Sequence, residues 1–344
     1  MDKKKAIWAV LFLVIAGFSI WAVIAQCQDF SLENFKECIK TANPLWLFVA
    51  LACMMGFIVF EGMAIQSIIK AFGYPKSAGR GFVYSSADIY FSAITPSATG
   101  GQPASAYFML GDGIPGAVVT VSLIVNLIMY TAAILVTGLI CLIVRPRLYL
   151  GFHLLGRILI VAGYAILLGM GILFLLFIKK EKFIFGIADR VTVFLGKIHF
   201  LHRVSKRRRN LVKTMQEYRQ CTRMIAGHQK MLVKAFIFNF LQRVSQISVT
   251  LCVFLATGGE VDKAVDIWVT QSFVAIGSNC VPIPGAMGVA DYLLLDGFSG
   301  MMSTHYATNL ELLSRSLSFY SCIIISGVTV VAAYLCRRLG RKQK

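Results

Sequence analysis

Five ionisable side chains lie inside segments that are otherwise apolar, and their types suit the binding of a charged ligand. They are Glu61, Asp88, Asp291, Arg243 and Arg315. Charge is costly in hydrocarbon, so such residues normally face a polar interior and mark a site or a pathway. Arginine suits phosphate because its planar guanidinium binds two oxygen atoms and stays charged in a poor solvent. We predict that Arg243 and Arg315 hold a phosphate, whereas Asp88 and Asp291 balance them or meet a cationic group.

The same charged residues permit a structural interpretation of equal weight. Ion pairs between the two arginines and the three acids would lock the helices together without any ligand, because buried charges need partners in either case. Arg243 is further marked by its neighbours. Asn239, Arg243 and Gln246 recur at spacings of four and three residues, so they share one face of a helix.

Helix-breaking and polar residues interrupt two of the apolar segments. The first interruption, residues 94–103, lies within residues 82–110, and the second, residues 282–288, lies within residues 268–295. Lipid cannot hydrogen-bond a broken backbone, so such segments persist only inside protein or beside a wet cavity. Paired interruptions in the two halves of a chain are typical of the central site of a transporter. Beside the charged residues, that site is expected to contain Thr95, Pro96, Gly100, Gly101, Gln102, Asn279, Pro284, Gly285 and Gly288.

The glycines of these interruptions have two interpretations. They let the backbone approach a ligand, and the helices that follow them would present free N–H groups to a phosphate. Alternatively, they only permit tight packing between helices. The prolines and polar residues beside them favour the binding interpretation, because packing alone does not need them.

The composition is that of an integral membrane protein. Hydrophobic residues make up 57% of the chain, charged residues make up 15%, and the mean hydropathy is +0.72. The net charge of +18 raises nucleic-acid binding as an alternative, but 15 of the basic residues lie between Lys179 and Lys234 and most others lie beside apolar segments. Such residues set membrane topology and bind anionic lipid, so we expect no nucleic acid as a partner.

Six apolar segments are long enough to span a membrane. They are residues 6–25, 45–69, 117–144, 158–178, 236–257 and 316–336. Positive charge places both termini, residues 70–80 and residues 179–234 in the cytoplasm of a cell-membrane protein. This assignment holds only if residues 82–110 and 268–295 form re-entrant hairpins that enter from opposite faces. Its one misfit is that Arg145, Arg147 and Arg157 would then lie outside the cell.

The sequence thus predicts an all-α integral membrane protein with six spanning helices and two opposed re-entrant hairpins, in one domain over residues 1–344. Pro96 precedes Gly100 by four residues and Pro284 precedes Gly288 by four, which favours an inverted-topology repeat. Residues 1–178 would form the first half and residues 231–344 the second. Residues 179–230 lie between the halves. Within them, residues 182–201 carry an apolar stripe typical of an interfacial helix, with a solvated cytosolic hairpin as the alternative.

The two motifs resemble those of a known family. The first motif, residues 95–107, contains Thr-Pro, Gly-Gly-Gln-Pro and Tyr, and the second, residues 282–291, contains Pro-Ile-Pro-Gly, Gly-Val and Asp. Both are similar to motifs of the lysylphosphatidylglycerol synthase transmembrane family. This family includes the membrane domain of bacterial multiple peptide resistance factors, which act in antibiotic resistance. The second motif departs from the usual pattern, because Ala286 replaces a glycine and Asp291 replaces a glutamate.

The resemblance implies a flippase-like protein that moves an anionic or aminoacylated phospholipid, such as lysylphosphatidylglycerol, between leaflets. In full-length relatives the membrane unit is joined to a soluble acyltransferase domain that uses aminoacyl-tRNA. With eight residues after Cys336, we expect that domain to be absent and the chain not to be an enzyme. A phosphatidylglycerol lysyltransferase-type membrane transferase and a small-solute transporter stay open as alternatives. The sequence leaves two protein partners as alternatives: a soluble lipid-modifying enzyme and a second copy of the chain.

Signals for other chemistry are poor. The sequence has no P-loop, GxGxxG, HExxH or Gly-x-Ser-x-Gly motif, and we expect no cofactor. His199 and His202 have no third metal ligand in the sequence pattern, so we expect no metal. Cys27 and Cys38 lie in the same short loop. They could form a disulfide or remain as two free thiols.

Overall fold

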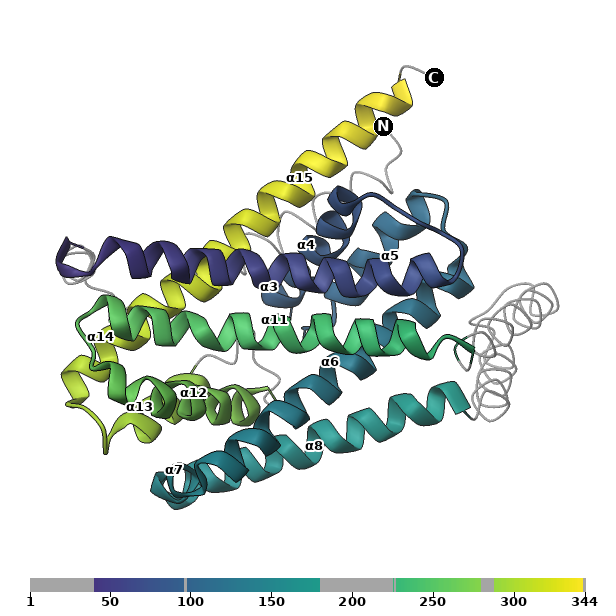
Figure 1. The fold of residues 1–344 in the computed structure, drawn as a ribbon. Helices are drawn as coiled ribbons and strands as arrows, with labels where there is room; N and C mark the ends of the chain where they lie inside the picture. Colours follow the sequence, from purple (N-terminus) through teal and green to yellow (C-terminus); the bar gives the residue numbers. More distant parts are fainter. Residues whose placement is uncertain (1–39, 96–97, 180–224, 226, 280–287, 343–344) are drawn as a thin grey trace, which may run out of the picture.

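The computed structural model describes residues 40–95, 98–179, 225, 227–279 and 288–342, and these residues form helices without a strand (Figure 1). Five of the helices are long and apolar enough to cross a membrane. The structure therefore confirms the prediction of an all-α membrane protein. The predicted first span, residues 6–25, and the predicted interfacial helix, residues 182–201, lie outside the described residues.

The first half contains α3 to α8. Their bounds are α3 Pro44–Ala71, α4 Ala78–Ile94, α5 Gly101–Gly111, α6 Gly116–Val144, α7 Pro146–Gly151 and α8 Leu154–Lys179. The second half contains α11 Gln229–Ala256, α12 Ala264–Ser278, α13 Val289–Phe298, α14 Thr304–Arg315 and α15 Ser321–Lys342, with the 3₁₀ turn η3 Val261–Lys263 and the π-helical segment η5 Ser316–Tyr320. The predicted spans 45–69, 117–144, 158–178 and 236–257 match α3, α6, α8 and α11. The last span begins earlier than predicted, because α14, η5 and α15 follow one another from Thr304.

The helices α3 and α11 lie side by side and antiparallel in the middle of the molecule (Figure 1). Asn43 at the start of α3 donates its backbone N–H to the carbonyl of Ala256 at the end of α11, over 2.8 Å. A Cβ atom on Gly56 of α3 would lie 3.0 Å from the Ser245 hydroxyl of α11, so the two helices meet closely. Small residues permit such an approach in membrane proteins.

The helices α4 and α5 form a hairpin whose two ends lie where α3 ends. Lys76, just before α4, donates its ammonium to the backbone carbonyl of Asp112, just after α5, over 2.9 Å. The Arg80 guanidinium of α4 lies 3.5 Å from the Asp112 carboxylate. On α3, a Cβ at Gly62 would lie 2.8 Å from the backbone of Gly81, so α4 packs closely on α3.

The helices α12 and α13 form a second hairpin at the opposite end of the molecule. The start of α12 meets the end of α6, where Arg145 donates to Asp266 over 3.0 Å. The end of α13 meets the start of α8, where Asp296 accepts from the backbone N–H of His153 at 3.1 Å. Because α3 and α11 are antiparallel, this is the end at which α3 begins. The open ends of the two hairpins therefore lie at opposite ends of the bundle; that the hairpins are re-entrant and enter a membrane from opposite faces stays a prediction.

Two of the arginines that conflict with the positive-inside rule have ion-pair or hydrogen-bond partners at the end of the bundle where α3 begins. Arg145 pairs with Asp266, and Arg157 donates to the carbonyls of Phe152 and Leu150. Their positive charge is therefore held by protein groups at the surface. This removes much of the conflict between these residues and the predicted topology.

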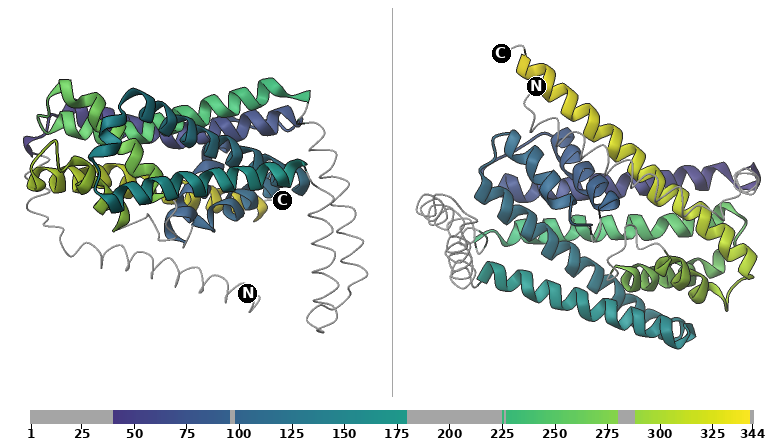
Figure 2. Two further views of the ribbon diagram at one scale, coloured as in Figure 1. Left: turned by 90° about the horizontal axis from the view of Figure 1, so that it is seen from below. Right: turned by 180° about the vertical axis from the view of Figure 1, so that it is seen from behind.

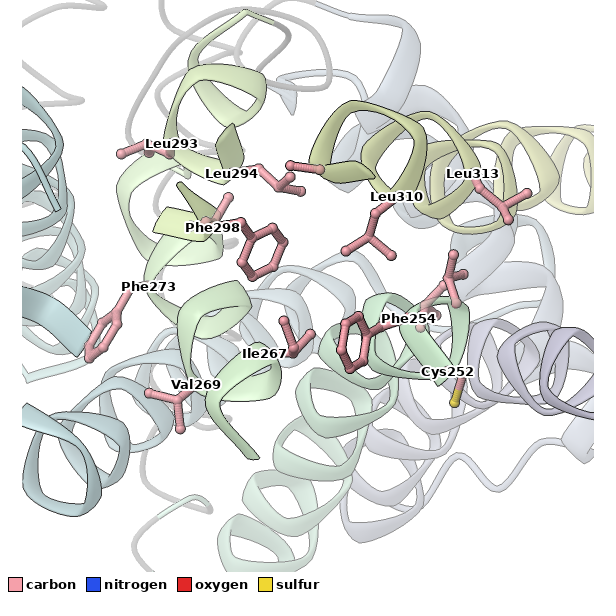
Figure 3. Packing of buried hydrophobic residues seen from close by; sticks show 14 of the residues in the cluster. Cys252, Phe254, Ile267, Val269, Phe273, Leu293, Leu294, Phe298, Leu310 and Leu313 are labelled. Atoms are coloured by element: carbon pink, nitrogen blue, oxygen red, sulfur yellow. The ribbon is translucent and has the colours of Figure 1, made fainter. Parts of the chain in front are cut away.

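An apolar cluster holds the second hairpin against its neighbours (Figure 3). Phe298 of α13, Ile267 of α12, Phe254 of α11 and Leu310 of α14 point toward one another and are almost fully buried. Burial of side chains of this size excludes lipid from the space between these helices. The cluster fixes the positions from which α12 and α13 run toward the centre of the bundle.

Candidate functional site

A row of polar side chains on α11 is buried in the centre of the bundle. Asn239, Gln242 and Arg243 are each at most 3% exposed. Spacings of three and four residues place them on one side of the helix. Asn239 donates to the side-chain carbonyl of Asn126 on α6 over 3.0 Å. The polar row thus faces other helices rather than lipid.

Arg243 is the charged member of this row. Its guanidinium lies over the ring of Tyr130 on α6, 4.1 Å from the ring centroid, and one of its terminal nitrogens donates to the side chain of Gln246. Its Nε has no hydrogen-bond partner. Thr137 of α6 and Ser272 of α12 line a cavity of about 10 Å³ beside it. A buried guanidinium with a free donor beside the second hairpin is suited to an incoming anion.

Two carboxyl groups connect the first hairpin to the same row. Gln242 of α11 donates to the Glu61 carboxyl of α3 over 2.9 Å, and Gln102 of α5 donates to the Asp88 carboxyl of α4 over 2.9 Å. The carboxyl groups of Glu61 and Asp88 contact each other, and Glu61 is also within electrostatic reach of Arg243. This network therefore links α3 with α11 and α4 with α5 through side-chain hydrogen bonds, and the two pairs of helices meet at Glu61 and Asp88.

The glycines of the first hairpin serve close packing. A Cβ on Gly101 would overlap Asp88 and the Ser92 hydroxyl of α4. The backbone N–H of Gly100 is bound by the Thr95 hydroxyl over 2.9 Å. The packing interpretation therefore holds for Gly101, while the N–H groups of the first turn of α5 still lack helical carbonyl partners.

In the second hairpin, the residues at the start of α13 form a charged cluster. Gly288 adopts a positive φ of 79°, which favours glycine, and its N–H donates to the Asp291 carboxylate over 2.8 Å. Arg315 of α14 forms ion pairs with Asp291 and with Glu311, the latter at 3.3 Å. Two carboxyl groups thus face a single guanidinium. Arg315 is thus ion-paired within the protein, and the binding of a phosphate by Arg315 stays a prediction.

The structure brings the predicted site residues into two groups. Asp88, Gln102 and Arg243 belong to the central network, with Thr95, Gly100 and Gly101 at its edge. Asp291, Arg315 and Gly288 belong to the second hairpin, and Asn279 is exposed at the end of α12. Pro96, Pro284 and Gly285 lie outside the described residues.

Glu61, which the sequence also marks as an ionisable residue in an apolar segment, belongs to the central network. Two further residues, Gln242 and Glu311, complete the two groups. Gln242 lies three residues after Asn239, so the spacing on α11 already contains the signal for it. Among the residues that the structure describes, no cluster of metal ligands is present.

The family resemblance is tested by comparison with known proteins. A family model described as lysylphosphatidylglycerol synthase TM region matches residues 7–326. No curated protein and no solved structure matches the chain. The match includes both interrupted segments, the polar row of α11 and the charged cluster of α13 and α14. The chain belongs to the lysylphosphatidylglycerol synthase transmembrane family.

Proposed function

We propose that this protein is a lipid translocase that moves an anionic or aminoacylated phospholipid, such as lysylphosphatidylglycerol, between the leaflets of the cell membrane. The protein would bind the lipid phosphate at one site and an ammonium group at a second site. The two hairpins would admit the head group from either side of the membrane. The family membership supports a role connected with lysylphosphatidylglycerol.

The observation that carries the proposal is the free Nε of Arg243. A guanidinium that is 3% exposed and only partly hydrogen-bonded loses solvation without full compensation. A phosphate oxygen would supply the missing acceptor and balance the charge. The cavity beside Arg243 is too small for a head group, so entry requires α12 to move away from α6 and α11.

The charged cluster of the second hairpin supports an aminoacylated substrate. Arg315 cannot balance Asp291 and Glu311 together when both are ionised. The side chain of Asp291 is 35% exposed, so it is open to a ligand. A lysyl head group carries ammonium groups that would suit this position.

We also propose that each hairpin dips into the membrane from its own face. The end with Lys70, Lys76 and Arg80 would face the cytoplasm, following the positive-inside rule. In this arrangement the Glu61–Asp88 network belongs to the cytoplasmic hairpin and Asp291 to the outer one. A head group would pass from one hairpin to the other along α11.

Reconstitution of the purified protein into liposomes tests the proposal. Proteoliposomes with fluorescent lysylphosphatidylglycerol in the inner leaflet should expose it to an outer quencher faster than empty liposomes do. Arg243→Lys keeps the charge but removes the free Nε and the planar fork. We expect it to slow exposure about tenfold, the cost of one charge-assisted hydrogen bond.

Arg145→Lys is the matched control, because Arg145 pairs with Asp266 at the end of the molecule and is half exposed. It should transport at the wild-type rate. Wild-type transport by Arg243→Lys, in protein of normal yield, would remove Arg243 from the site. Lysyl transfer from charged tRNA by the purified chain would instead favour the membrane transferase, and selective passage of a soluble solute would favour the solute transporter.

A further inference from the structure

A cavity of about 490 Å³ lies between the first turns of α4 and the last turns of α15, away from the network around Arg243. Its lining includes Ser77, Gly79, Arg80, Val83, Cys336 and Arg337. The two helices pack along each other, and the view from behind in Figure 2 shows α15 passing across the first hairpin toward the C-terminus. A cavity of this volume is large enough for the head group of a lipid.

The cavity carries excess positive charge. Arg80 and Arg337 both form ion pairs with Asp112, and Lys76 donates to the backbone carbonyl of the same residue. Arg337 also donates to the carbonyl of Phe108 over 2.9 Å, and its side chain is only 14% exposed. Two guanidiniums therefore share a single carboxylate, which holds them in place but does not neutralise them, and the Lys76 ammonium adds positive charge at the backbone of the same residue. Arginines fixed in this way are suited to a phosphate.

The start of α4 adds to this charge. Ser77 is the N-cap of α4, but its side chain makes no capping hydrogen bond. The N–H of Arg80 donates to the Ser77 carbonyl over 2.9 Å, whereas the N–H groups of Ala78 and Gly79 lack helical acceptors, and the helix dipole makes this end positive. Ser77 and Gly79 both line the cavity, so these groups lie beside the two guanidiniums. An anion in the cavity would meet positive groups from both helices.

The cavity lies at the level along α15 where an exposed apolar surface ends. The outward side of α15 exposes large apolar side chains: Ile324, Val328, Val331 and Leu335. The last residue of this surface, Leu335, comes directly before Cys336 and Arg337, which line the cavity from another side of the helix, and Val83 gives the cavity an apolar wall. Apolar surface that stops at arginines is typical of the membrane–water interface, where cations meet anionic head groups.

We infer that this cavity binds the phosphate group of an anionic phospholipid, at a site separate from the one proposed around Arg243. The phosphate would lie between Arg80 on α4 and Arg337 on α15, while the acyl chains leave the cavity past Val83 and Ala333. Such a lipid would bridge the first hairpin and the last helix. This binding does not require that the protein transports lipid.

Cys336 provides the readout, because its thiol is exposed and lines the cavity. The full chain in detergent is treated with N-ethylmaleimide, and the alkylation rate at Cys336 is followed by mass spectrometry of its peptide. Dioctanoyl phosphatidylglycerol should slow alkylation several-fold, and dioctanoyl phosphatidylcholine should do so less. Equal protection by inorganic phosphate at the same concentration would overturn the assignment to a lipid.

Gly79 gives a variant that changes the cavity without disturbing the packing, because a Cβ there would meet open space. Gly79→Glu places a carboxylate at the mouth of the cavity, and a negative charge in the first turn also favours the helix. We expect phosphatidylglycerol to bind Gly79→Glu at least tenfold more weakly, whereas Gly79→Ala binds as wild type. Arg80→Gln should weaken binding similarly.

The inference is wrong if phosphatidylglycerol leaves the alkylation rate of wild-type Cys336 unchanged, or if it protects Gly79→Glu as well as wild type. Arg243→Lys separates this site from the proposed transport site. It should keep the full protection of Cys336 while its transport slows. Loss of protection in that variant would contradict a separate site.

Discussion

At residue 101 the chain needs a glycine, because α5 begins against the Asp88 carboxyl group. A methyl group there would overlap Asp88 and Ser92. We predict that Gly101→Ala lowers the free energy of unfolding by about 1–3 kcal/mol, the usual cost of overpacking. Gly79→Ala is the matched control, because its methyl group enters open space and removes chain entropy from the unfolded state. Urea unfolding in detergent compares the two, and equal stability would contradict the close approach of α5 to Asp88.

The charged residues of the site could be predicted from the sequence, but their partners could not. An ionisable side chain in an apolar segment is visible in the sequence, which singled out Glu61, Asp88, Arg243, Asp291 and Arg315. Which acid meets which base depends on the rotation of each helix about its axis. Arg315 selects Asp291 and the nearby Glu311, whereas Arg243 lies over Tyr130, a contact that no spacing rule predicts.

Among the elements, the hairpins give the sharpest prediction about topology. Both ends of α4–α5 lie together, and both ends of α12–α13 lie at the other end of the bundle. In a Cys336→Ser background, single cysteines at Ala78 and Gly116 should react with an impermeant maleimide only from the cytoplasmic side. Cysteines at Asp262 and Gly300 should react only from outside. All four positions are exposed.

The matched comparison in this experiment is the Cys336→Ser protein without an added cysteine, which sets the background labelling of the remaining cysteines. Reaction of Ala78→Cys and Gly116→Cys from opposite sides would mean that α4 and α5 cross the membrane, and both the re-entrant hairpin and the proposed path along α11 would be wrong.

The lengths of the apolar segments predicted most of the long helices, because a segment of about 20 apolar residues is easily recognised in a sequence. The exception is α14, which the predicted span 316–336 leaves out. Glu311 and Arg315 interrupt the apolar pattern there, but they pair with each other and their helix packs on α11 and α13. A charged helix that is buried by its partners carries no apolar signal of its own.

At the scale of the whole molecule, α3 and α11 form a central pair from which the two hairpins extend on opposite sides. The thiols of Cys53 on α3 and Cys252 on α11 contact each other. We predict that oxidative cross-linking of these two cysteines leaves lipid transport at the wild-type rate, because movement of the hairpins does not require this pair to separate. Transport is measured in proteoliposomes after the cross-link is confirmed by non-reducing peptide mapping. The uncross-linkable Cys252→Ala variant is the control, and arrest of transport only in cross-linked protein would show that the central pair itself moves.

The π-helical segment η5, between α14 and α15, has a consequence for both ends of the last helix. A π turn holds one residue more than an α turn, and each residue of an α-helix advances the chain by about 100° around the axis. If Ser316–Tyr320 relaxed to regular α-helix, α15 would have to twist relative to α14 by about that angle. Arg315 would stay at Asp291 while Arg337 turned away from Asp112. A change at the second hairpin would in this way rotate the end of α15 and move Arg337 at the first hairpin.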